Sequence, residues 1–107
     1  MEDFSTIYKI LNALHKSMDC DDFDMNLISP ERLGISRNRW LYLMRMLAER
    51  GYVADFEVYI GADGGFSVSP GARPRLTLAG LEYLEENSLM KRAYRLAKGI
   101  KDVTPGI

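Results

Sequence analysis

The sequence predicts an α+β fold: a winged helix-turn-helix with an extra C-terminal helix. Two helical segments at residues 30–51 follow one another across a short turn that contains glycine. A segment rich in β-branched and aromatic residues comes directly after them, and an Asp-Gly pair within it indicates a hairpin. Amphipathic helices are predicted on both sides of these elements. We therefore expect one domain over residues 1–107, in the order helix, short strand, helix, helix, hairpin wing, helix.

The first predicted element is an amphipathic helix over residues 1–19. Its apolar residues recur at helical spacing and form one stripe, which consists of Phe4, Ile7, Tyr8, Leu11, Leu14 and Met18. An acidic loop follows this helix. Residues 25–28 are predicted as a short strand before the next helix.

The helix-turn-helix is predicted from its caps and its apolar spacing. Ser29, which precedes a proline, suits the N-cap of the first helix, and Gly34 ends that helix after one or two turns. Ser36 caps the second helix, and Gly51 stands where a C-terminal glycine belongs. The predicted core face of the second helix carries Trp40, Leu43, Met44 and Leu47.

The wing is predicted over residues 52–76. Residues 52–60 form the outgoing strand, Asp63 and Gly64 lie in the turn, and residues 66–69 form the return strand. Two prolines and a glycine after this point predict that the return strand is short or interrupted.

Two helices are predicted within residues 77–103. Thr77 caps the first helix, over residues 78–86, and Gly80 allows that helix to approach a neighbour closely. Its predicted inner face carries Leu78, Leu81 and Leu84. The second helix covers residues 89–101.

Several segments resemble one known family. They are FSTIYKIL at residues 4–11, SPERLGIS at 29–36, GYV at 51–53 and LTLAGLEYLEENS at 76–88. These segments resemble the YjcQ-like family, small winged-helix proteins of Gram-positive bacteria and their phages. The resemblance covers nearly the whole chain. The resemblance implies a winged-helix fold and a phage or mobile-element setting, and it implies no catalytic site.

Composition excludes several classes of protein. Lys and Arg total 14 and Asp and Glu total 15, so the net charge is −1. This balance excludes a strongly basic nucleic-acid coat protein but leaves room for a local basic patch. One Cys and one His provide neither an internal disulfide nor a zinc site built from these residues. No apolar run is long enough for a membrane span, and the N-terminus lacks signal-peptide character. We expect a cytoplasmic protein.

The sequence contains no motif that predicts catalysis or cofactor binding. An EF-hand that started at Asp19 would need Gly at its sixth position and Glu at its twelfth, where Asp24 and Pro30 stand. The glycines of the wing have the wrong spacing for a phosphate-binding loop. We expect no catalytic residue, no cofactor and no metal ion, and therefore no enzyme.

The second helix of the helix-turn-helix is the main functional candidate. Its outward side chains are of types that can form hydrogen bonds to the base edges and phosphates of double-stranded DNA. The predicted DNA contacts are Arg37, Asn38, Arg39, Tyr42 and Arg45, with Arg73 and Arg75 supporting them from the wing. The same face also suits a protein contact or a solvated surface. We expect the acidic first 30 residues to face away from DNA or toward a basic protein surface.

A second group of residues is a candidate for protein contact. Met46 points obliquely outward, and the last helix carries a basic face beside an apolar stripe. The predicted partner or dimer contacts are Met46, Lys91, Arg95 and Lys98. The last helix also suits ordinary packing or a phosphate contact. Two functions remain open: a DNA-binding regulator, functioning as a homodimer, and an interaction module that binds a host or phage protein without DNA.

Overall fold

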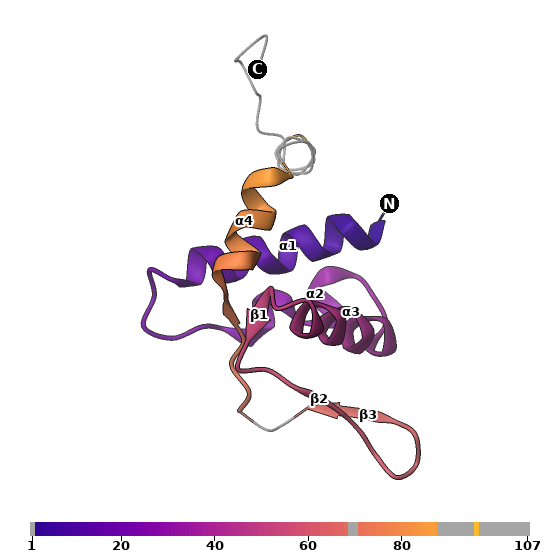
Figure 1. Cartoon of the computed structure of the whole chain (residues 1–107). Coiled ribbons are helices and arrows are strands. Elements are labelled where there is room, and N and C mark those ends of the chain that lie inside the picture. Colours follow the sequence, from indigo (N-terminus) through magenta and orange to yellow (C-terminus); the bar gives the residue numbers. More distant parts are fainter. Residues whose placement is uncertain (1, 69–70, 88–95, 97–107) are drawn as a thin grey trace.

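Helix α1 lies across the centre of the molecule, with α4 on one side of it and α2 and α3 on the other (Figure 1). The computed structural model describes residues 2–68, 71–87 and 96. Its helices are α1 (Glu2–Ser17), the 3₁₀ turn η1 (Met25–Ile28), α2 (Pro30–Leu33), α3 (Arg37–Glu49) and α4 (Leu78–Glu86). Its strands are β1 (Val53–Ala54), β2 (Val58–Ile60), β3 (Phe66–Val68) and β4 (Arg75–Leu76). The fold is α+β, with helices and two short antiparallel strand pairs.

The predicted caps of α2 and α3 are confirmed. Ser29 Oγ accepts a hydrogen bond from the backbone N–H of Arg32, and Ser36 Oγ accepts one from that of Arg39. Gly34 and Gly51 have φ of 72° and 79°, which favours glycine. At α3, Tyr52 N–H donates to the Leu47 carbonyl and Gly51 N–H to the Ala48 carbonyl. These two bonds form a Schellman motif, which ends the helix and turns the chain into β1.

The prediction of a strand at residues 25–28 is wrong, because this segment forms η1. The Asp24 carboxylate accepts a hydrogen bond from the backbone N–H of Asn26 at 3.0 Å. Leu27 N–H then donates to the Asp24 carbonyl, which closes a tight turn. The local hydrogen bonds of Asp24 therefore satisfy the backbone here in place of a strand ladder.

The segment predicted as the wing forms two strand pairs, whereas the sequence predicts one outgoing strand over residues 52–60. β1 pairs with β4, and Val53 lies opposite Leu76. β2 pairs with β3, and Val58 lies opposite Val68. Three residues separate the pairs on the outgoing side and six on the return side, so one continuous ladder is impossible. Asp55 has a φ of 61° at the break, and this left-handed conformation bends the chain.

The hydrophobic core lies between α1, α3, η1, β1 and α4. The buried apolar side chains are Tyr8, Ile10, Leu11, Leu14, Ile28, Trp40, Leu41, Leu43, Met44, Leu47, Val53, Phe56 and Leu84. All four residues predicted for the core face of α3 are among them. Phe4, Met18 and Leu78 were expected on apolar inner faces but are 50%, 64% and 75% exposed. Phe4 and Leu78 lie in the first turns of α1 and α4, and Met18 follows the last residue of α1.

Trp40 joins α3 to η1 and to the chain after β1. Its indole N–H donates to the backbone carbonyl of Ile28 at 2.6 Å, in a buried position. Its ring meets that of Phe56 edge to face, with the ring centres 6.0 Å apart. A buried indole N–H requires a partner of this kind, so the bond fixes where η1 lies against α3.

Helix α4 begins directly on the turn that ends α3. Thr77 Oγ1 accepts from the backbone N–H of Gly80, as predicted for its N-cap, and donates to the Gly51 carbonyl. Thr77 N–H donates to the Tyr52 carbonyl at 3.1 Å. A Cβ on Gly80 would collide with that same carbonyl oxygen and lie 2.6 Å from Leu76 Cδ1. The predicted close approach at Gly80 is thus confirmed.

The described helices include none with the length and apolar character that crossing a bilayer requires. The predicted last helix, at residues 89–101, lies outside the described residues except for Leu96.

Candidate nucleic-acid interface

The first two turns of α3 present polar side chains on the side opposite the core. Arg37, Asn38, Arg39 and Tyr42 are exposed, whereas Arg45 is half-buried. Core residues occupy the other side of the helix, so its orientation on the domain is fixed. No acidic residue occurs in α3 before Glu49. Arg and Asn on one exposed face can form bidentate hydrogen bonds to base edges, and Tyr can reach a phosphate.

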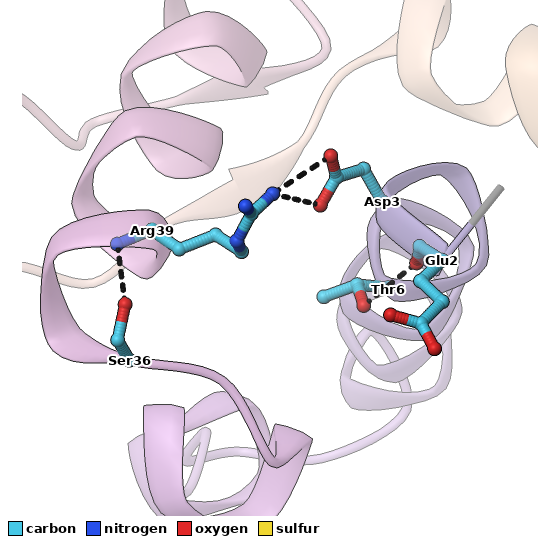
Figure 2. A network of polar contacts seen from close by, with 5 residues as sticks. All are labelled: Glu2, Asp3, Thr6, Ser36 and Arg39. Atoms are coloured by element: carbon cyan, nitrogen blue, oxygen red, sulfur yellow. Dashed lines mark hydrogen bonds and ion pairs between the residues drawn. The ribbon is translucent and has the colours of Figure 1, made fainter.

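Arg39 is held by an acidic residue of α1. Its Nη1 donates to both carboxylate oxygens of Asp3, at 2.7 and 2.9 Å (Figure 2). Asp3 lies in the first turn of α1, where the helix dipole also stabilises a negative charge. Both side chains remain about half exposed, so the pair is accessible to solvent and salt. A phosphate would therefore have to compete with Asp3 for Arg39.

Other arginines of the predicted set are in ion pairs as well. On the hairpin, Arg75 Nε donates to Asp55 Oδ2 at 2.7 Å, next to the bend. Arg45 Nε lies 3.6 Å from Oε2 of Glu49, which is one turn further along α3.

Arg73, also on the hairpin, donates to Asp22 Oδ1 at 3.0 Å. Arg37 is different, because it has no ion-pair partner within residues 2–68 and 71–87.

The structure does not gather all the predicted contacts in one place. Arg39 meets Asp3 at the start of α1. Arg73 meets Asp22, which shares a pocket with Lys16 near the other end of α1. Positions 3 and 16 of a straight helix are about 20 Å apart at 1.5 Å per residue. The two arginines therefore belong to separate parts of the surface.

Two acids of the first 30 residues contact arginines of the predicted DNA-binding set. Asp3 and Asp22 contact Arg39 and Arg73, which are 36 and 51 positions further along the chain. Sequence reasoning missed both acids as parts of the site. The spacing of residues along the sequence does not predict such pairs, because they depend on how α1 and the hairpin pack against the rest of the molecule.

Met46 lies beside an apolar groove between the start of α1, the end of α3 and α4. The groove has a volume of about 540 Å³ and is also lined by Phe4, Ile7, Tyr52 and Tyr83. Met46 and Phe4 are each 50% exposed. Burial raises the pKa of Tyr83 above its usual value, and neighbouring Tyr52 adds to this effect.

The other predicted partner contacts, Lys91, Arg95 and Lys98, lie outside the described residues.

The described part of the chain contains no group of three His, Cys, Asp or Glu side chains arranged to hold a metal ion. Its single Cys, Cys20, is an exposed free thiol. His15 is exposed near the end of α1.

Together, the fold and this surface define a small α+β domain with a capped two-helix turn, a bent hairpin and an exposed polar helix face. The chain belongs to the YjcQ protein family, whose family model matches residues 8–103. The family expected from the sequence resemblance is thus confirmed. No curated protein matches the chain. No solved structure matches it either.

Proposed function

We propose that the chain is a non-enzymatic winged helix-turn-helix protein that binds double-stranded DNA as a transcriptional regulator. The family resemblance implies a phage or mobile-element setting. The observation that carries the proposal is the exposed face of the first two turns of α3, which presents Arg37, Asn38 and Tyr42 and no acid. In helix-turn-helix proteins, the N-terminal part of the second helix enters the major groove. The order α2, turn, α3, hairpin supports this assignment.

Within the proposed surface, the residues have different roles. Arg37 and Asn38 face solvent at the N-terminus of α3 and are the best placed for base edges. Arg39 is the next candidate, after release from Asp3. The hairpin arginines are paired with acids and make weaker phosphate contacts. A domain of this size has a small footprint, so useful specificity requires two copies on two half-sites.

DNA binding is tested by the fluorescence anisotropy of a labelled random duplex at about 50 and about 200 mM salt. We expect micromolar binding that weakens steeply with salt, because counterions are released from phosphates. Arg37→Ala should weaken binding at low salt and lower the salt slope by about one unit if Arg37 touches a phosphate. If Arg37 instead hydrogen-bonds to a base edge, Arg37→Ala should cost about 1–3 kcal/mol of binding free energy at the specific DNA site. That site is first selected from random duplexes.

Arg50→Ala is the matched control, because Arg50 is an exposed arginine at the opposite end of α3. It changes the net charge equally and should weaken binding less than Arg37→Ala. Equal effects of the two substitutions on both the random duplex and the selected specific site would indicate a general charge effect and contradict the assignment of α3.

The groove beside Met46 favours a second candidate function, a protein-interaction module that binds a host or phage protein. Met46 and Phe4 are both half exposed and line the same groove. The groove therefore presents a flexible and an aromatic apolar side chain to a partner. The anisotropy experiment separates the two candidates. Absence of duplex binding even at about 50 mM salt would reject the DNA proposal and leave the interaction module.

A further inference from the structure

A second concave site lies between the C-terminal half of α1, the acidic loop, η1 and α2. Its volume is about 520 Å³, within the usual range of about 300–1,000 Å³ for small-molecule sites. Its apolar lining consists of Ala13, Phe23, Leu27 and Leu33. All of these side chains except exposed Leu27 are partly buried against the hydrophobic core, so the core supports this wall of the pocket.

Three basic side chains line the same pocket. Lys9 and Lys16 are seven positions apart on α1, so they lie on one side of the helix about two turns apart. Arg32 comes from α2. Within the described ranges, no ion pair includes any of these three side chains. This distinguishes them from the arginines of the hairpin.

The acids of the pocket are already engaged by other groups. Asp22 binds Arg73 of the hairpin at 3.0 Å. Asp24 accepts the backbone N–H of Asn26 at the start of η1. Neither acid forms an ion pair with the two lysines or with Arg32, so these three side chains remain available to an anionic ligand. A pocket with an apolar wall and three cations that form no ion pair with the described residues suits a ligand that has an apolar body and an anionic group.

We propose that this pocket binds a small organic acid, in which a carboxylate is attached to an aromatic or branched apolar body. The apolar body packs against Phe23 and Leu33, and the carboxylate meets Arg32 and the α1 lysines. This site is separate from the exposed face of α3, and its test requires no DNA. The pocket proposal can therefore fail while DNA binding stands, and the reverse also holds.

The test is a titration of the whole chain with naphthoate, followed by backbone amide NMR shifts. Naphthamide, which has the same ring system and no charge, serves as the comparison ligand. We expect saturable shifts centred on residues 9–33, with naphthoate bound at least about threefold more tightly than naphthamide. Equal affinity of the two ligands, shifts scattered over the surface, or no saturation by about 10 mM would overturn the proposal.

Substitutions assign the charge preference to individual side chains. Lys9→Gln and Arg32→Gln should each reduce the affinity for naphthoate about threefold and leave that for naphthamide unchanged. Arg50→Gln, a charge-matched change outside the pocket, should alter neither affinity. The dispersion of the amide spectrum shows that each variant is folded. A uniform effect of all three substitutions on naphthoate would mean that net charge, not this pocket, attracts the anion.

Discussion

Arg37 and Arg39 are neighbours in one turn of α3, yet their side chains have different surroundings. Arg39 is bound to Asp3, whereas Arg37 has no ion-pair partner among the described residues. Residue type and helical spacing were enough to predict that both are exposed. They were not enough to predict the ion pair, because Asp3 reaches Arg39 only through the packing of α1 against α3.

A prediction at the residue scale concerns Tyr83 and alkaline pH. Its pKa is raised above the usual value of about 10, mainly by burial and secondly by Tyr52. The folded protein therefore holds this proton more tightly than the unfolded chain does. The resulting stabilisation is complete below about pH 10 and is lost as the pH rises through the raised pKa. We expect the free energy of unfolding to decrease less steeply above about pH 10 in Tyr83→Phe than in the parent protein.

The measurement is urea unfolding between about pH 8 and pH 11, followed by circular dichroism. Tyr59→Phe is the control, because Tyr59 is an exposed tyrosine on β2. The slope of Tyr83→Phe is compared with the slopes of the parent protein and of this control. If the free energy of unfolding of Tyr83→Phe fell with pH as steeply as that of the parent protein, groups other than Tyr83 would cause the loss of stability at alkaline pH.

At the scale of elements, local signals predicted the helices better than the strands. Ser29, Ser36 and Thr77 act as caps where the sequence placed them, because a cap needs only nearby backbone N–H groups. Residues 25–28 look like a strand by composition, but the adjacent Asp24 favours a tight turn. The break at Asp55 was also missed, because a left-handed aspartate has no strong signature in a β-rich segment.

The contact of α4 with the end of α3 leads to a prediction for Gly80→Ala. In an exposed helix this change would stabilise by about 1 kcal/mol, because glycine is a poor helix former. Here the new Cβ would collide with the Tyr52 carbonyl and crowd Leu76. We expect a net loss of about 1–3 kcal/mol in the free energy of unfolding, measured by urea denaturation.

Glu82→Ala, at an exposed position of the same helix, should change stability by less than about 0.5 kcal/mol. If Gly80→Ala were stabilising instead, α4 would not lie against Tyr52 as described.

For the binding of anions by the whole molecule, the positions of the charged side chains matter more than the net charge of −1. Acids from α1, the loop after it and the hairpin each meet an arginine proposed to bind DNA. Exposed pairs of this kind contribute little to stability, about 1 kcal/mol or less. Their larger effect falls on any anion that approaches the same arginines.

We therefore expect Asp3→Asn to tighten duplex binding about two- to fivefold at low salt, because it releases Arg39 and removes a negative charge. The gain should shrink at about 200 mM salt. Anisotropy with the labelled duplex measures both effects, and thermal unfolding should change little.

Glu2→Gln is the matched control, since Glu2 lies in the same turn of α1 and forms no ion pair with the described residues (Figure 2). It should give a smaller gain than Asp3→Asn. In an Arg39→Ala background the advantage of Asp3→Asn over Glu2→Gln should vanish. Persistence of that advantage would mean that Asp3 acts by general repulsion.

The bend at Asp55 has a consequence for how the molecule tolerates changes in length. The β1–β4 pair contains buried Val53 and closes the core, whereas the exposed loop at residues 61–65 joins β2 to β3. Pairs of residues inserted near this loop extend only the outer ladder and leave the inner ladder in register. The outer half of the hairpin is thus a natural place to graft a peptide tag or a fluorophore attachment site.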